Sequence, residues 1–213
     1  MRIDMQTITL SADNPDSINT ALSYFKEGEI VAFPTDTVYG LGADVFQASG
    51  IIKLFEAKGR DSNKAIAILI GSIDQIPLIT DHMTDMALRL CEVFWPGGLT
   101  VIVPRKKTLP ELISNTDRIG IRIPNHPVTL ELLKAFGPLA TTSANLAGKP
   151  SGKNASEVVA QLNNRVPLVL DGGDCPGGVP STVVDCSGKE PIILREGPIS
   201  SDEIFKVLEI QNA

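Results

Sequence analysis

Apolar and polar positions follow two different periods along this chain, and they predict helices and strands in alternation. Residues 14–27 place Ile18, Leu22 and Phe25 on one face of a helix, and Gly28 follows as a stop signal. Residues 30–33 form a short apolar run that is typical of a buried strand. The same patterns predict further helices over residues 49–57, 84–94, 128–136 and 156–163. Further strands are predicted over residues 65–70, 99–103, 119–123, 139–142, 168–170, 181–185 and 191–195.

The last third of the chain has a different organisation. Its strands over residues 168–170, 181–185 and 191–195 are separated only by short connections, which predicts that they pair antiparallel. The expected fold class is therefore mixed α/β, with a twisted parallel and antiparallel sheet surrounded by helices. No Pro- or Ser-rich linker interrupts the pattern, so we expect a single domain over residues 1–213 with its core at about 14–209.

Composition is typical of a globular protein. The 213 residues are 43% hydrophobic and 21% charged. The formal net charge is −6, which does not favour a protein whose function is non-specific nucleic-acid binding. No apolar run approaches the roughly 20 residues of a membrane helix, and the N-terminus lacks the apolar core of a secretory signal. Three cysteines without C-x-x-C spacing are typical of reduced thiols. We therefore expect a cytoplasmic protein without a membrane partner.

The stretch PTDTVYGLG at residues 34–42 raises the main question about function. It follows a buried strand and presents Thr35, Asp36, Thr37 and Tyr39 together, more polar groups than a plain turn requires. Other polar or glycine-rich clusters also border predicted strands, at residues 95–98, 120–124, 141–145, 171–173, 180–182 and 195–197. Because ligands of open α/β sheets gather at strand ends, these clusters predict a shared cavity.

Cations and hydroxyl groups are the chemistry that these clusters offer. The stretch KGRDSNK at residues 58–64 carries Lys58, Arg60 and Lys64, which suit an anionic ligand or, alternatively, complement a helix dipole. In TTSAN, alternation places Thr141, Ser143 and Asn145 on one face of an extended segment, although Ser-Ala-Asn also suits a turn.

Two arginines stand at strand positions of the predicted sheet. Arg122 lies between Ile121 and Ile123 and projects to the opposite face from both, and Arg195 has a similar setting in ILREG. Each arginine is either solvated or available to grip a carboxylate with two hydrogen bonds. Ser151, which follows GKP, is a further candidate for the same site.

Several familiar sites are absent from the sequence. It contains neither a P-loop nor a G-x-G-x-x-G motif, and His82 and His126 have no metal-ligand spacing. Ser143 is not in a G-x-S-x-G elbow, so a serine hydrolase is not indicated. The sequence thus favours residues that bind phosphates and orient substrates over a protein nucleophile.

The order PTDTVYGLG, KGR, WPGGLT, IGIRIPNHP, TTSAN-LAGKPS and STVVD…LREG resembles the YrdC-like family over residues 28–197. More narrowly it is similar to the threonylcarbamoyl-AMP synthases, in a short form without a C-terminal extension. This resemblance implies a twisted mixed sheet around a large basic cavity. It also implies a nucleotidyltransferase that makes L-threonylcarbamoyladenylate and pyrophosphate from L-threonine, bicarbonate and ATP. The product serves modification of the adenosine next to the anticodon, position 37, in tRNA.

The resemblance also implies roles for single residues. Threonine contacts are implied for Thr37, Arg122, Thr141 and Ser181. ATP contacts are implied for Arg60, Lys64, Arg118, Ser143, Ser151 and Arg195. The K-x-R and S-x-N signature residues, expected to be catalytic, are Lys58, Arg60, Ser143 and Asn145. One departure is Leu69, which stands where many members have a histidine near the amino acid.

The expected cofactor is Mg²⁺ supplied with ATP, without protein ligands and without an organic cofactor. Expected partners are a downstream tRNA threonylcarbamoyl-transfer complex and a possible direct contact with tRNA, including double-stranded RNA. Two alternatives remain open from the sequence: a carbamoyl-adenylate-handling protein, like a domain of hydrogenase-maturation carbamoyltransferases, and a non-catalytic RNA-binding module. A threonine-dependent ATP–pyrophosphate exchange assay separates the three.

Overall fold

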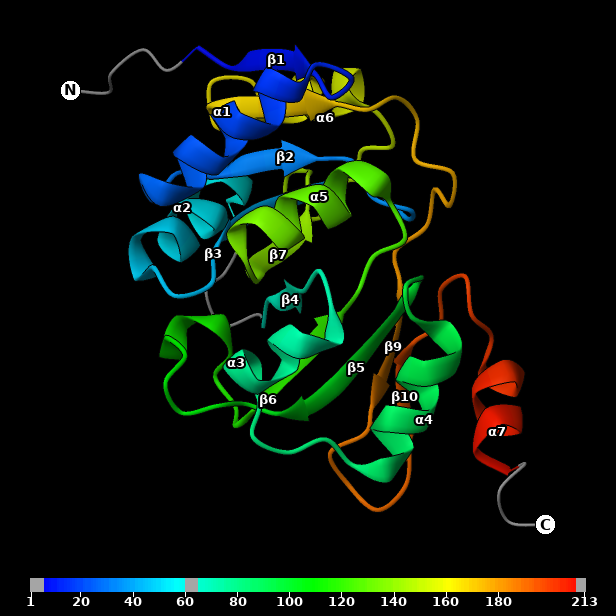
Figure 1. Ribbon diagram of the computed structural model, residues 1–213. Helices are drawn as coiled ribbons and strands as arrows, with labels where there is room; N and C mark the ends of the chain where they lie inside the picture. Colours follow the sequence, from blue (N-terminus) through cyan, green and yellow to red (C-terminus); the bar gives the residue numbers. More distant parts are fainter. Residues whose placement is uncertain (1–5, 60–64, 210–213) are drawn as a thin grey trace.

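One mixed sheet forms the centre of the molecule (Figure 1). The computed structural model describes residues 6–59 and 65–209, and within them the sheet has ten strands in the order β1-β8-β2-β3-β7-β4-β6-β5-β9-β10. The pairs β1·β8, β2·β8, β4·β6 and β5·β9 are parallel, and the other pairs are antiparallel. The strands are β1 Ile8–Ser11, β2 Val31–Phe33, β3 Gly40–Asp44, β4 Ala67–Leu69, β5 Leu99–Pro104, β6 Arg118–Arg122, β7 Leu139–Ser143, β8 Leu168–Asp171, β9 Thr182–Asp185 and β10 Ile192–Arg195.

The helices surround this sheet. They are α1 Pro15–Lys26, α2 Ala48–Lys58, α3 Ile76–Ile79, α4 Asp85–Phe94, α5 Pro127–Phe136, α6 Ala155–Leu162 and α7 Ser201–Glu209, with short 3₁₀ turns η1 Ile73–Gln75 and η2 Glu111–Ile113. Side-chain caps explain several starts, because Asn14, Thr84 and Asn154 each accept a hydrogen bond from a first-turn N–H. The mixed α/β fold and most predicted elements are thus confirmed, although β4 is shorter than the predicted 65–70.

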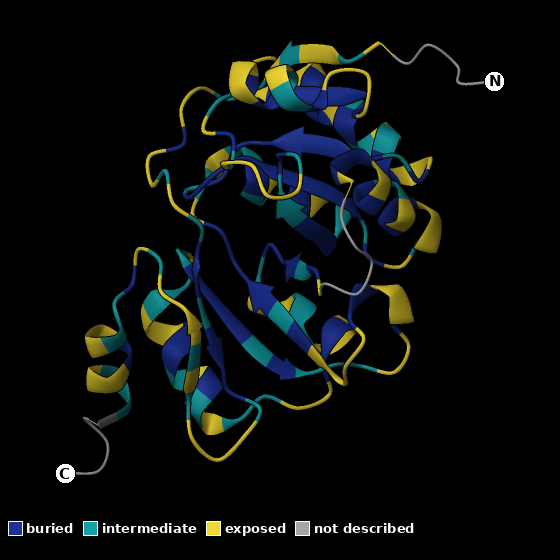
Figure 2. Cartoon of the chain, turned by 180° about the vertical axis from the view of Figure 1, so that it is seen from behind, coloured by how far each residue is buried: buried dark blue, intermediate teal, exposed yellow. Residues whose placement is uncertain are grey.

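Two hydrophobic clusters cover the two faces of the sheet. Helices α1 and α5 pack on one face, where the rings of Phe25 and Phe136 lie 5.2 Å apart. The larger cluster on the other face includes residues from α2, α4, α6 and α7. In Figure 2 the strands are mostly dark blue and the helices carry yellow on their outer sides, as expected for helices that bury one stripe.

The predicted antiparallel pairing of the last three strands is only half right. Strands β9 and β10 are antiparallel, but β8 pairs parallel with β1 and β2, and β9 pairs parallel with β5. Residues 172–181 do not form a hairpin turn. They extend along the loop after β2, where the N–H groups of Gly177 and Gly178 donate to the carbonyls of Asp36 and Thr37. The connection therefore carries the chain from one half of the sheet to the other.

Besides the short α3 and the two 3₁₀ turns, the sequence analysis did not predict β1, β3 or α7. Strand β3 contains two glycines and lacks clear alternation, and β1 lies before the core boundary that we expected at residue 14. Helix α7 had a readable start signal, because Ser200 and Glu203 form a capping box in which each side chain bonds the other residue's N–H. No helix within the described residues is long and apolar enough to cross a bilayer.

The glycines of β3 allow a close approach to β2, and we predict that Gly42→Ala destabilises the fold. A Cβ at Gly42 would lie 2.7 Å from Cε1 of the buried Phe33 ring. Overpacking of this kind costs about 1–3 kcal/mol, measurable as a lower midpoint of urea unfolding. The control is Gly188→Ala, where the new Cβ meets only Glu190 O at 3.9 Å. Equal midpoints for both variants and the wild type would contradict the prediction.

Candidate functional site

A cavity of about 340 Å³ lies on the sheet face that also carries α1 and α5. The register explains its position, because Ser143 pairs with Gly40, Thr141 with Ala67, and Arg122 with Leu69, so these alternate positions share a face. Its lining residues are Thr35, Thr37, Val38, Tyr39, Gly40, Ala65, Ile66, Ala67, Leu69, Thr100, Ile102, Gly120, Arg122, Thr141, Thr142, Ser143, Pro180, Ser181, Val183 and Arg195.

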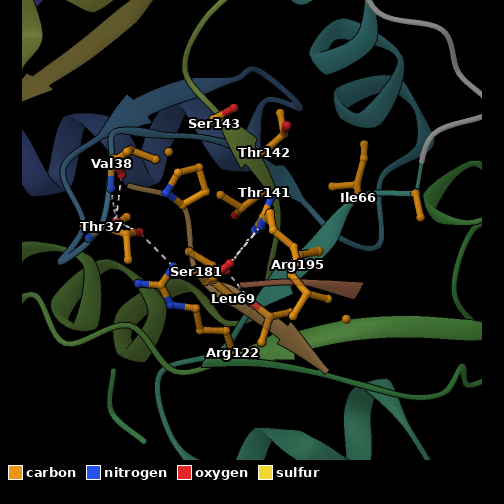
Figure 3. Close-up of a pocket in the computed structure, with 18 of the residues that line it drawn as sticks. Thr37, Val38, Ile66, Leu69, Arg122, Thr141, Thr142, Ser143, Ser181 and Arg195 are labelled. Carbon is orange, nitrogen blue, oxygen red and sulfur yellow. Dashed lines mark hydrogen bonds between the residues drawn. The ribbon is translucent and has the colours of Figure 1, made fainter. Parts of the chain in front are cut away.

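The cavity gathers residues that are far apart in the sequence. All four predicted threonine contacts line it: Thr37, Arg122, Thr141 and Ser181. Two predicted ATP contacts, Ser143 and Arg195, line it too (Figure 3). Arg60 and Lys64 lie outside the described residues. The prediction of a basic cavity therefore stays a prediction.

The loop after β2 shows why PTDTVYGLG is so polar. The Thr35 hydroxyl donates to Val38 O and accepts from the N–H groups of Thr37 and Val38, which folds the loop back on itself. Asp36 turns to Arg122, and the Tyr39 hydroxyl donates to Gly173 O at 2.9 Å. Burial raises the pKa of Tyr39, so this phenol stays a neutral structural anchor.

Arg122 is held by three acceptors. Its Nε donates to Gly97 O at 2.8 Å, its Nη1 to Thr37 Oγ1 at 2.9 Å, and its Nη2 to Asp36 Oδ1 at 2.5 Å. The residue is only 5% exposed, and this burial lowers its pKa while the charge of Asp36 opposes the shift. The WPGG loop thus contributes a carbonyl that orients Arg122.

Arg195 is the second cation of the cavity. Its Nε donates to Ser181 O at 2.9 Å and its Nη2 to Ser181 Oγ at 3.2 Å, and Figure 3 shows it extending toward Ser181. The hydroxyls of Ser181 and the buried Thr100 lie 2.8 Å apart. Partial burial lowers the pKa of Arg195, and its charge also lowers the pKa of Arg122. Two guanidinium groups that face one cavity favour an anionic ligand.

The lining also has an apolar part. Val38, Ile66 and Leu69 lie along the cavity with Thr141 and Thr142, as Figure 3 shows. The hydroxyl of Thr141 donates to Leu139 O at 3.1 Å, so its proton is used within β7. A ligand with both an anionic group and a small apolar group fits this division.

Lys58 and Asn145 lie behind Ser143 and are not among the lining residues of the described cavity. The Lys58 ammonium donates to Ser143 O, and to Asn145 O and Oδ1 at 2.7 and 2.9 Å. The Ser143 hydroxyl donates to Asn145 Oδ1 at 2.6 Å. In this arrangement the two residues support the segment that carries Ser143. Their predicted catalytic role stays a prediction.

Arg118 and Ser151 also lie outside the set of lining residues. Arg118 is two positions before Gly120 and four before Arg122, so it shares the cavity face of β6, and its Nη1 lies 2.6 Å from Asp185 Oδ2. Ser151 precedes Gly152, whose carbonyl accepts from the N–H of Tyr39 at 2.9 Å. Their predicted ATP contacts stay predictions.

Sequence reasoning missed Thr100 and the pairing of Asp36 with Arg122. The signal for Thr100 was a hydroxyl residue inside the apolar stretch LTVIV. No comparable signal pairs Asp36 with Arg122, which are 86 positions apart. Within residues 6–59 and 65–209, no three His, Cys, Asp or Glu side chains are grouped as a protein metal site requires.

Comparison with known proteins agrees with these features. A family model for Sua5/YciO/YrdC, described as "Telomere recombination", matches residues 23–197. The threonylcarbamoyl-AMP synthase of Bacillus subtilis is 40% identical over 205 residues, which cover 95% of this chain and 59% of that protein.

Two solved structures extend the comparison. The Sua5 structure of Pyrococcus abyssi in complex with L-threonine is 37% identical with a TM-score of 0.87, over 90% of this chain and 57% of that one. The structure of E. coli YciO is 27% identical with a TM-score of 0.80, over 91% of this chain and 96% of that one. The chain spans less than two thirds of the B. subtilis and P. abyssi relatives. The match of the family model over most of the length shows that the chain belongs to the Sua5/YciO/YrdC family.

Proposed function

We propose that this chain is an L-threonylcarbamoyladenylate synthase, a nucleotidyltransferase that joins L-threonine, bicarbonate and ATP and releases pyrophosphate. The relatives named threonylcarbamoyl-AMP synthase support the proposal, as does the relative solved with L-threonine. The observation that carries it is the donor-rich end of the cavity, where Arg122, Thr37 and Ser181 converge. Such a set of donors recognises a carboxylate.

In this proposal the threonine carboxylate takes the donors of Arg122, Thr37 and Ser181. Its methyl group lies against Val38 and Leu69, which line the same cavity. Leu69 is only 4% exposed, so an apolar contact there excludes water. The carboxylate of threonine thus suits the donor-rich end of the cavity, and its methyl group suits the apolar part of the lining.

The proposed reaction has two bond-forming steps. The threonine nitrogen attacks the bicarbonate carbon, a C–N bond forms, and water leaves to give a carbamate. A carbamate oxygen then attacks the α-phosphorus of ATP, and the bond to pyrophosphate breaks. Residues Arg60, Lys64, Ser143 and Arg195 stabilise the phosphate charge in this proposal, and the cavity contributes proximity by holding both substrates.

Mg²⁺ bound to the triphosphate neutralises phosphate charge in such transfers. The described residues provide no carboxylate cluster for it, so the triphosphate oxygens are the main ligands in this proposal. The proposal extends to a cytoplasmic protein whose product passes to a threonylcarbamoyl-transfer complex for position 37 of tRNA. A direct contact of this chain with tRNA belongs to the same proposal.

The direct test is ATP–pyrophosphate exchange with purified protein. We expect exchange only when L-threonine and bicarbonate are both present, because the adenylate forms on the carbamate. Excess EDTA is expected to abolish the exchange, and added Mg²⁺ to restore it. Exchange without threonine, or full exchange in EDTA, would contradict the proposed reaction or its metal requirement, respectively.

We further predict that Leu69→Ala reduces the preference for L-threonine over L-serine. A methyl group in an apolar pocket is worth about 1–3 kcal/mol, and the truncated side chain no longer packs against it. The measurement is the ratio of the two kcat/KM values, and the control is Leu78→Ala, since Leu78 is 46% exposed on α3. An unchanged ratio in Leu69→Ala would remove this residue from the methyl pocket.

A further inference from the structure

We propose that Asp36 is a positioning residue for the amino-acid substrate, because it fixes the guanidinium of Arg122 and cancels its charge. The inference rests on the proposed function, since it concerns how the same cavity receives a zwitterion. Asp36 is not among the residues that line the described cavity, so its action is through Arg122.

The Asp36 carboxylate is itself held in place. Its Oδ1 accepts from Arg122 Nη2 at 2.5 Å and from the N–H of Asn125 at 3.0 Å. The Asp36 and Arg122 side chains are 14% and 7% exposed, so water screens the pair weakly. The carbonyls of Asp36 and Thr37 accept from Gly177 and Gly178, which adds a backbone anchor from residues 172–181. Residues 122–125 therefore hold the carboxylate directly, and residues 172–181 hold the backbone of the loop that carries it.

The donors of Arg122 show what this arrangement leaves for a ligand. A guanidinium has five N–H donors, and the described residues accept three of them: one from Nε, one from Nη1 and one from Nη2. One donor therefore remains on each terminal nitrogen. Because Arg122 lines the cavity, these two donors are available to a ligand carboxylate.

The hydroxyl of Thr37 adds a third donor. It accepts from Arg122 Nη1 and lies 3.0 Å from the Thr35 hydroxyl. That Thr35 hydroxyl already donates to Val38 O and accepts from two backbone N–H groups, which uses its full capacity. Because Thr35 gives its own proton to Val38 O, Thr37 is the donor in the 3.0 Å contact, and a ligand carboxylate, as a charged and stronger acceptor, would take that proton in place of the crowded Thr35 hydroxyl.

The charges around the cavity explain why Arg122 needs Asp36 as its partner. Arg122 and Arg195 both face the cavity, and two uncompensated cations would attract a carboxylate but repel the ammonium group of the same amino acid. Asp36 neutralises Arg122, whereas the contacts of Arg195 within the described residues are with the neutral Ser181. The pair therefore offers directed donors without an added net charge.

The test is calorimetric binding of L-threonine and of ATP to Asp36→Asn. Asparagine keeps the shape but loses the charge, so we expect the Kd for L-threonine to rise about tenfold, which corresponds to about 1.4 kcal/mol. The Kd for ATP is expected not to rise, because ATP has no ammonium group to be repelled. The matched control is Glu29→Gln, which breaks the more exposed ion pair with Lys53 and should change neither Kd.

Two results would overturn the inference: unchanged L-threonine binding in Asp36→Asn, or equal losses for both ligands, which would indicate a collapsed cavity. If Asp36→Asn does not fold, Asp36→Glu decides. It keeps the charge but displaces the carboxylate, so weaker threonine binding with normal ATP binding supports positioning, and wild-type threonine binding overturns it.

L-serine and glycine are titrated in parallel. If the wild type binds one of them but not L-threonine, the proposed function is contradicted. The role of Asp36 is then tested by the binding of that amino acid to the wild type and to Asp36→Asn. A wild type that binds none of the three overturns the inference. Failure of pyrophosphate exchange alongside the expected binding pattern would contradict the proposed function alone.

Discussion

The buried ion pair between Arg122 and Asp36 is the interaction on which the rest of the site depends. A guanidinium that is 5% exposed carries a large desolvation penalty, and the charge of Asp36 together with two neutral acceptors offsets it. These acceptors come from the loop after β2 and from the WPGG loop, so one side chain on β6 joins segments from distant parts of the sequence. Loss of one partner would leave a buried charge uncompensated, which costs about 3–5 kcal/mol in typical proteins.

The sheet places this pair where a ligand can reach it. Strand β6 lies between β4 and β5, and its alternate residues Gly120 and Arg122 face the cavity while Ile119 and Ile121 face the core. The long connection of residues 172–181 then places Ser181 and, through β9 and β10, Arg195 against the same cavity. The fold thus brings two guanidinium groups and several hydroxyl groups together, and the described residues contain no cluster of metal ligands.

Much of this arrangement was predictable from local signals. Asn14 and Gly28 bracket the first helix, and the polar clusters at strand ends correctly indicated a shared cavity with Thr37, Arg122, Ser181 and Arg195. Local patterns do not report long-range partners, which is why the pairing of Asp36 with Arg122 was missed. They also do not separate a hairpin from an extended connection, so the Gly- and Pro-rich residues between the predicted strands 168–170 and 181–185 were expected to be a short connection between antiparallel strands. The signature residues Lys58 and Asn145 were found, but not their position behind Ser143.

In the proposed function, Arg122, oriented by Asp36, receives the carboxylate of an amino acid. A crystal structure of the protein with L-threonine tests it most directly. We expect the carboxylate oxygens within about 3 Å of the terminal nitrogens of Arg122 and of the Thr37 hydroxyl, with the Asp36 contact retained. A threonine carboxylate bound elsewhere, or an Arg122 side chain that leaves Asp36 when the ligand binds, would contradict the account.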